Sequence, residues 1–79
     1  MLSTLVKTHA VAVDGRRFAV RYFEVQTPRG HRRYTAEILL GPTDRIILDD
    51  DSVLRLEAKA TRAVPAMVYS RMLARETAA

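Results

Sequence analysis

The sequence contains no cysteine. Disulfide bonds, zinc–thiolate sites and cysteine nucleophiles are therefore excluded, and the redox environment is left open. The sequence also lacks a run of about 18 apolar residues, the length that a membrane-spanning helix needs. Residues 1–7 do not have the charged start and apolar stretch of a signal peptide. We therefore expect no export by that route, no membrane partner and, by default, a cytoplasmic protein.

Motifs for catalysis are equally scarce. Histidine occurs only at His9 and His31, and neither is set against a nucleophile or a carboxylate in a catalytic spacing. No glycine-rich loop of the kind that cradles phosphate is present. We expect a protein without enzyme activity and without a cofactor.

The aspartates at positions 49–51 are the one cluster of potential metal ligands, because carboxylate oxygens bind magnesium or calcium. However, the glycine and the distal glutamate of an EF-hand loop do not follow at the required positions. Ser52 and a helical pattern do follow, and acidic and hydroxyl side chains cap helix N-termini. Capping explains the run, and no metal site is expected.

The composition is that of a folded domain, with 48% apolar and 28% charged residues in a chain of 79. This length fits one domain over residues 1–79. In so short a chain, apolar burial only about balances the entropy lost on ordering, so a homodimer or a bound partner is a reasonable expectation. The net charge of +4 modestly favours anionic partners.

Two turn sequences indicate a β-meander. Asp14-Gly15 suits a two-residue type I′ hairpin. Pairing outward from it predicts Val11–Phe18, His9–Val20 and Lys7–Tyr22 on a mostly apolar face, and Ala12–Arg17 and Thr8–Arg21 on a mostly polar one. Residues 27–31 (TPRGH) suit a three-residue hairpin loop. It predicts Tyr22–Ala36, Val20–Ile38 and Phe18–Leu40 on the same apolar face, and Arg21–Glu37 on the other. The two turns agree and predict strands over 5–13, 16–27 and 31–40.

The rest of the chain predicts a short strand and helix. Residues 45–48 suit a fourth strand after the break at 41–44, so the sheet spans 5–48. A helical part over 51–75 follows, with Val53, Leu56, Ala60 and Ala63 or Val64 toward the apolar sheet face. Pro65 either kinks this helix or, as we slightly prefer, separates two short ones, the second with Val68, Tyr69, Met72 and Leu73 on its apolar side. Residues 76–79 form a frayed tail. The predicted class is α+β, an antiparallel three- to four-stranded meander with helix on one face.

The polar sheet face is the strongest candidate for binding. The register brings Arg17, Arg21 and Arg33 together there with Phe23, Val25, Val6 and Leu39. Cations interleaved with an aromatic would suit single-stranded nucleic acid. An apolar patch would suit a protein interface or a dimer. We favour a protein partner, because the apolar side chains outnumber the stacking ones, and assign partner binding to Arg17, Arg21, Phe23, Val25 and Arg33.

The two hairpins carry further basic residues that are candidate anion contacts: Arg16, Arg29, His31 and Arg32. Solvated turns and edges protected by charge would explain the same residues. The two tips lie at opposite ends of the predicted sheet, so they cannot form one tight patch. These basic residues nevertheless keep open an alternative function, that of a small basic RNA- or DNA-binding regulatory module.

A very short basic chain with a sheet-plus-helix core, no catalytic constellation and an apolar face bearing arginines resembles the small phage-encoded inhibitors of the anti-CRISPR type. The resemblance is one of size and architecture. It implies a stoichiometric inhibitor that occupies a CRISPR nucleoprotein complex and blocks target DNA binding. The implied partner is a protein or a protein–nucleic-acid complex.

Overall fold

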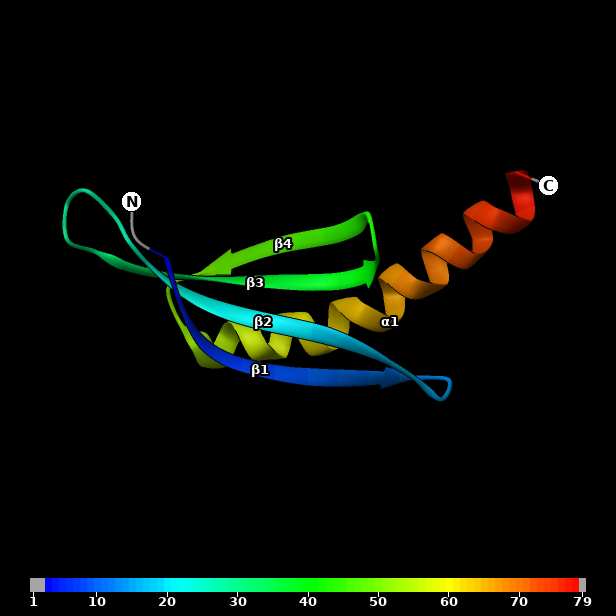
Figure 1. The fold of residues 1–79 in the computed structure, drawn as a ribbon, viewed down its shortest axis with the longest axis horizontal. Helices are drawn as coiled ribbons and strands as arrows, with labels where there is room; N and C mark the ends of the chain where they lie inside the picture. Colours follow the sequence, from blue (N-terminus) through cyan, green and yellow to red (C-terminus); the bar gives the residue numbers. More distant parts are fainter. Residues whose placement is uncertain (1–2, 79) are drawn as a thin grey trace.

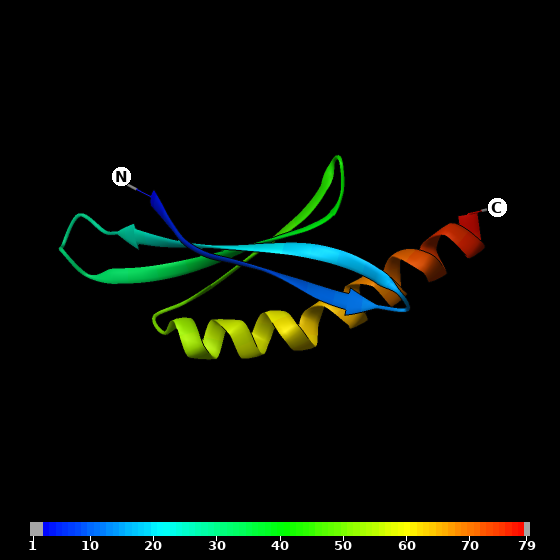
Figure 2. The ribbon, with the colours of Figure 1, turned by 60° about the horizontal axis from the view of Figure 1, so that its bottom comes forward.

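The computed structural model describes residues 3–78. An antiparallel sheet of four strands in the order β1-β2-β3-β4 is followed by one helix. Its elements are β1 (Ser3–Val13), β2 (Arg16–Gln26), β3 (Arg32–Gly41), β4 (Asp44–Asp50) and α1 (Val53–Ala78). The helix covers one face of the sheet and leaves the other bare, as Figure 1 and Figure 2 show. The predicted α+β meander is confirmed.

The first two hairpins have the expected registers. Asp14 and Gly15 both have positive φ, 50° and 79°, as a type I′ turn requires. All five predicted pairs between β1 and β2 are present, and Tyr22–Ala36, Val20–Ile38 and Arg21–Glu37 are present between β2 and β3. The second ladder ends at Val20–Ile38, so the expected pairing of Phe18 with Leu40 is absent. Both side chains nevertheless pack in the same apolar cluster.

The edge strands differ from the sequence prediction in detail. A bulge in β1 between Leu5 and Lys7 inserts Val6 as an extra residue, so that Leu5, and not Val6, is opposite Phe23. Strand β4 is longer than the expected 45–48, because Asp44 already pairs with Gly41 and Asp50 still pairs with Tyr34. The last strand is thus a full member of the sheet.

Helix α1 is continuous through Pro65, so the preference for two separate helices is wrong. Proline removes one helix hydrogen bond and its ring clashes with the carbonyl four residues earlier, which bends a helix away from the proline side. Pro65 is exposed, and in Figure 2 the axis turns toward the level of the sheet after it. Val64 and Val68, on either side of the bend, are both buried. The helix includes residues 76–78 of the expected frayed tail, and Ala79 lies outside the described residues.

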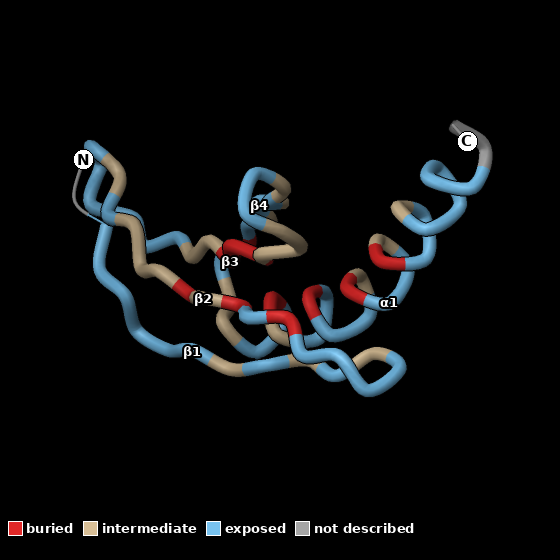
Figure 3. Tube along the Cα trace, turned by 45° about the vertical axis from the view of Figure 1, so that its right-hand side comes forward, coloured by how far each residue is buried: buried red, intermediate tan, exposed pale blue. Residues whose placement is uncertain are grey.

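The core lies between α1 and the apolar sheet face, where Figure 3 shows the buried segments of β2, β3 and one side of α1. Four helix residues at intervals of four contribute to it, namely Leu56, Ala60, Val64 and Val68. They pack on Phe18, Val20, Tyr22, Ala36 and Ile38. Of the second apolar side that the sequence predicted, only Val68 is buried, because α1 extends past the sheet (Figure 1) and leaves Tyr69, Met72 and Leu73 exposed.

A stacked ring pair fills the sheet side of this core. The ring of His9 lies on that of Tyr22, with centroids 5.2 Å apart. Tyr22 is fully buried, and its hydroxyl has no hydrogen-bond partner within the described residues. Burial, together with the nearby charge of Glu57, raises the pKa of Tyr22 to about 12. His9 is therefore a packing residue on the inward face, as its position in the register predicted.

Candidate functional site

The outer face, defined as the sheet face turned away from α1, carries all five residues predicted to bind a partner. Phe18, Val20 and Tyr22 face the helix, so their neighbours in β2 point the other way. These neighbours are Arg17, Arg21, Phe23 and Val25, and the register places Arg33 of β3 opposite Val25. The five residues thus share one surface, as the register predicted.

A buried carboxylate lies in the middle of the outer face. Glu37 is only 6% exposed, although no helix covers it. Both Nε and Nη2 of Arg21 donate to its Oε1, the former at 2.8 Å, and Nη1 of Arg45 donates to its Oε2 at 2.8 Å. The hydrogen bonds and charge of Arg21, followed by those of Arg45, lower the pKa of Glu37. One carboxylate thus holds an arginine on each side.

The arginines of the outer face differ in whether a carboxylate of this chain pairs with them. The guanidinium of Arg21 also lies over the ring of Phe23, 5.9 Å from its centroid. Arg33 donates to Asp49 at 2.8 Å, and this hydrogen bond raises the pKa of Arg33. Arg17 has no acidic partner within the described residues. Two of the three predicted arginines are therefore already neutralised by carboxylates of this chain.

Apolar side chains lie on both sides of these ion pairs. Phe23, Val25 and Leu39 are half-buried on the outer face. Leu5, opposite Phe23, is 52% exposed, and Ile47, opposite Glu37, is 55% exposed. A hollow of about 210 Å³ lies toward the β3–β4 turn, where Leu39 lines it together with Arg21, Glu37, Gly41, Pro42, Thr43, Asp44 and Arg45. The outer face thus combines paired charge with exposed apolar surface.

Sequence reasoning missed four residues of this surface: Leu5, Glu37 as its buried centre, Arg45 and Ile47. Leu5 was missed because nothing in the sequence marks the bulge at Val6. Arg45 and Ile47 were missed because a bulge at Leu40 shifts the register of β3 and β4 by one residue. Regular pairing outward from the turn at Pro42-Thr43 would put Leu48 opposite Glu37, whereas the structure has Ile47 there and Arg45 opposite Leu39. Glu37 was predicted on this face opposite Arg21, but its burial was not.

The candidate anion contacts do not meet at one place. Arg16 lies near the β1–β2 turn, with its guanidinium 5.3 Å from the centroid of the Phe18 ring. Arg29 and His31 are exposed in the β2–β3 turn, and Arg32 lies 3.6 Å from Glu24. The two turns are at opposite ends of the sheet (Figure 1), as expected. The basic hairpin tips therefore form two separate surfaces.

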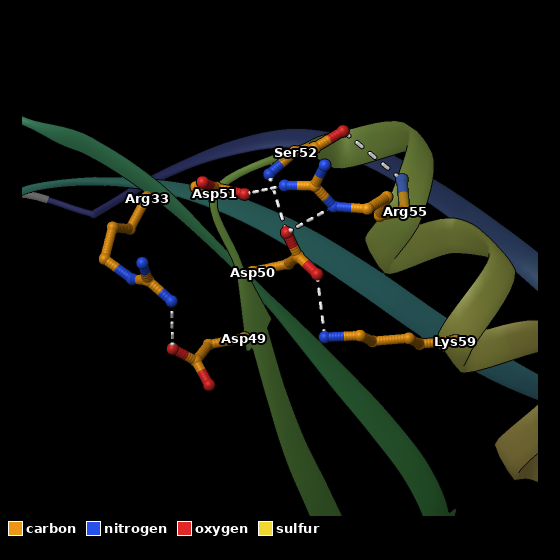
Figure 4. Close-up of polar contacts among 7 residues, drawn as sticks. All are labelled: Arg33, Asp49, Asp50, Asp51, Ser52, Arg55 and Lys59. Carbon is orange, nitrogen blue, oxygen red and sulfur yellow. Dashed lines mark hydrogen bonds and ion pairs between the residues drawn. The ribbon is translucent and has the colours of Figure 1, made fainter.

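The acidic run at 49–51 is engaged in capping and ion pairs, as Figure 4 shows. Asp50 is 8% exposed; it accepts from the Ser52 amide and from Arg55, and its Oδ2 lies 2.7 Å from Lys59 Nζ. The contact with Lys59 contributes most to lowering the pKa of Asp50. Asp51 pairs with Arg55, and Ser52 Oγ accepts from the Arg55 amide at 3.3 Å.

The directions of these side chains matter for metal binding. Asp49 points to the outer face and Arg33, whereas Asp50 points to the helix (Figure 4). Within residues 3–78, no three acidic or histidine side chains converge as metal ligands would. Contacts at the helix start account for the directions of Asp50 and Asp51, and the ion pair with Arg33 accounts for that of Asp49.

No family model, curated protein or solved structure matches this chain. Among the described residues there is also no helix with the length and apolar character needed to cross a membrane.

Proposed function

We propose that this protein is a non-enzymatic binding protein that contacts a protein partner through the outer face of its sheet. The observation that carries the proposal is that exposed Leu5 and Ile47 flank a centre where Glu37 already pairs with arginines. Surfaces of this kind, apolar with charges satisfied in advance, suit protein interfaces, whose centres are poor in unpaired charge. The hollow beside Glu37 offers a place for an anchoring side chain of the partner.

The same pairing argues against phosphate as the main ligand of the outer face. To bind a phosphate, Arg21 or Arg33 would have to share or leave its carboxylate, Glu37 or Asp49. The negative charge of those carboxylates would also repel the ligand. A protein surface meets neither difficulty, because apolar contact with Leu5 and Ile47 leaves the ion pairs in place.

A matched pair of variants tests the proposal. Ile47→Asp places a charge on the outer face, whereas Leu54→Asp places the same charge on α1, where Leu54 is 78% exposed. Each protein is used as bait in cells of its source, and recovered partners are quantified. A stoichiometric partner retained by wild type and Leu54→Asp but lost by Ile47→Asp supports the proposal. Equal recovery with all three proteins overturns it.

Self-association is distinguished by light scattering on the same three proteins at several concentrations. A dimer in wild type and Leu54→Asp that dissociates in Ile47→Asp identifies the partner as a second copy of this chain. A monomer in all three directs the search to a different protein.

The specific form that we propose is a stoichiometric inhibitor of the anti-CRISPR type, which occupies a CRISPR nucleoprotein complex and blocks target DNA binding. Its support is the small size, the α+β architecture and the mixed outer face. The test is a titration of purified CRISPR complexes with this protein in the presence of labelled target DNA. Loss of DNA binding near equimolar protein, restored by Ile47→Asp, supports this form, and undiminished DNA binding rejects it for the complexes tested.

A small nucleic-acid-binding module is the second candidate. It is favoured by Arg29 and His31, whose exposed side chains have no acidic partner within the described residues. Phosphate contacts release counterions, so affinity would fall steeply with salt. Arg29→Ala should then weaken binding and flatten the salt dependence, with a smaller effect from Arg33→Ala, because Asp49 already pairs Arg33. Absence of binding at low salt removes this candidate.

A further inference from the structure

A small hollow lies where the β1–β2 and β3–β4 turns approach the second half of α1. It has a volume of about 30 Å³ and is lined by Arg16, Phe18, Leu40, Asp44, Val68, Arg71, Met72 and Arg75. Phe18 and Val68 belong to the core on the helix side of the sheet. The hollow is therefore on the helix side of the sheet and shares only Asp44 with the lining of the outer-face hollow, so a ligand bound in it would not depend on the function proposed for that face.

The lining carries more positive than negative charge. It includes three arginines and one carboxylate, that of Asp44. Arg71 already engages this carboxylate with both Nε, at 2.8 Å, and Nη2, at 3.2 Å. These contacts, with a smaller contribution from the charge of Arg75, lower the pKa of Asp44. Arg16 and Arg75 have no carboxylate of their own within the described residues.

Two of the three guanidinium groups are held in place by contacts within the chain. Arg16 is stacked over the Phe18 ring, and Arg71 is fixed by its two bonds to Asp44. Arg75 follows Arg71 by four residues and so lies on the same side of the helix. The bend of α1 after Pro65 directs this part of the helix toward the level of the sheet (Figure 2).

Apolar side chains in the lining of the hollow favour its interaction with anions. The lining includes four apolar side chains: Phe18 and Val68 are buried, Leu40 is half-buried and Met72 is 46% exposed. Apolar lining displaces water and lowers the local dielectric constant, which strengthens the interactions of the charges beside it. Guanidinium forks match phosphate oxygens in pairs, and a phosphate group presents several oxygens to arginines arriving from different sides.

We propose that this hollow binds a phosphate group, held chiefly by Arg16 and Arg75, which have no carboxylate of their own within the described residues, beside Arg71, which keeps its bonds to Asp44. Three arginines against one carboxylate leave a formal surplus of two positive charges, which a phosphate near its double negative charge compensates. A carboxylate, with one charge, would compensate half of it. The phosphate is either free in solution or the terminal phosphate of a nucleic acid, and the two sources share the same contacts.

Titration of the full chain with inorganic phosphate tests the site, with chloride added to keep ionic strength constant and backbone amide shifts as the readout. We expect saturable shifts that centre on the lining of the hollow. Loss of one charged hydrogen-bonding group should weaken affinity about tenfold in Arg75→Ala and in Arg16→Ala. The control is Arg62→Ala, which removes the same charge from an exposed position of α1 outside the hollow and should leave affinity within about twofold.

Three outcomes overturn the proposal: no saturable shift, equal weakening by Arg62→Ala, or equal affinity for acetate at the same ionic strength. Circular dichroism of each variant confirms that the fold is retained. The source is resolved by comparing one oligonucleotide with and without a 5′-phosphate. Tighter binding of the phosphorylated form, lost in Arg75→Ala, identifies a nucleic-acid end. Equal binding of the two forms, with inorganic phosphate still bound, identifies free phosphate.

Discussion

Arg21 and Glu37 lie opposite each other on β2 and β3, and Nε of Arg21 donates to Oε1 of Glu37 at 2.8 Å. Because Arg45 of β4 reaches the other oxygen of Glu37, a single carboxylate connects three neighbouring strands. This happens on the face that α1 does not cover, where an unpaired carboxylate would simply be solvated. The pairing fixes Arg21, Glu37 and Arg45 relative to one another and leaves apolar side chains beside them exposed, Leu5 and Ile47 among them.

Replacing Glu37 with Gln should lower stability at neutral pH and weaken its acid dependence. The pKa of Glu37 is lowered in the folded chain from its ordinary value of 4.5, so the unfolded chain binds the proton more readily. The stabilisation is complete above about that pH and is lost as pH falls through the folded pKa. Denaturant unfolding at a series of pH values measures it. Glu76→Gln is the control, because Glu76 is exposed and has no cationic partner within the described residues. An acid dependence that is the same in wild type and Glu37→Gln would contradict this account.

Removing the hydroxyl of Tyr22 should not destabilise the protein. That oxygen is buried without a hydrogen-bond partner in the described structure, and such a group costs about 1–3 kcal/mol. Tyr22→Phe keeps the ring stacked on His9 and should raise the free energy of unfolding by about 1 kcal/mol. A loss of stability of the same size would show that the hydroxyl is satisfied in solution.

The same residue should determine part of the alkaline behaviour. Its pKa is raised from 10.0 to about 12 in the folded chain, so this phenol leaves the free energy of unfolding independent of pH below about pH 10 and lowers it as pH rises from 10 toward 12. Absorbance titration should show a tyrosine that ionises near pH 12 and is absent from Tyr22→Phe. An identical titration of the two proteins would contradict the burial of this phenol.

Most of the sheet could be predicted from two turns. Asp14-Gly15 and residues 27–31 fix the register of the strand pairing, and a register error of one residue would turn every side chain to the wrong face. The bulge at Val6 could not be predicted, because an inserted residue changes no turn and breaks no apolar pattern visible in one sequence. The continuity of α1 through Pro65 was missed for a related reason. Burial of Val64 and Val68 on the sheet outweighs the local preference of proline to end a helix.

The sequence predicted where the residues of the candidate site lie, but not which of its arginines are paired with carboxylates. Strand alternation placed Arg21 and Arg33 on the outer face, and the register already paired Arg21 with Glu37. The pairing of Arg33 with Asp49 depends on the register of β4, which the short run at 45–48 did not define. The difference matters for function, because an outer face of free arginines would favour phosphate, whereas neutralised arginines beside Ile47 favour protein.

Two leucines of α1, two residues apart, should differ strongly in how much stability is lost when each is replaced by alanine. Leu56 is fully buried against the sheet, and Leu54 is 78% exposed. Leu56→Ala should cost about 2–5 kcal/mol, a large part of the stability of so small a domain. Leu54→Ala should change stability by less than about 0.5 kcal/mol. Thermal and denaturant unfolding measure both. Comparable losses in the two variants would mean that α1 packs on the sheet through a different face.

Gly15 offers a test of the first turn that separates backbone strain from crowding. Its φ is +79°, and a Cβ added there would meet nothing within 4 Å. The cost of Gly15→Ala is therefore conformational, about 1–2 kcal/mol for an L-residue in left-handed geometry. A chain of 79 residues is accessible to chemical synthesis, and D-alanine at the same position adds the same methyl group without the strain. We expect L-alanine to lower the free energy of unfolding and D-alanine to restore it to at least the wild-type value. Equal losses for both would show that the added methyl group, and not the type I′ turn, limits this position.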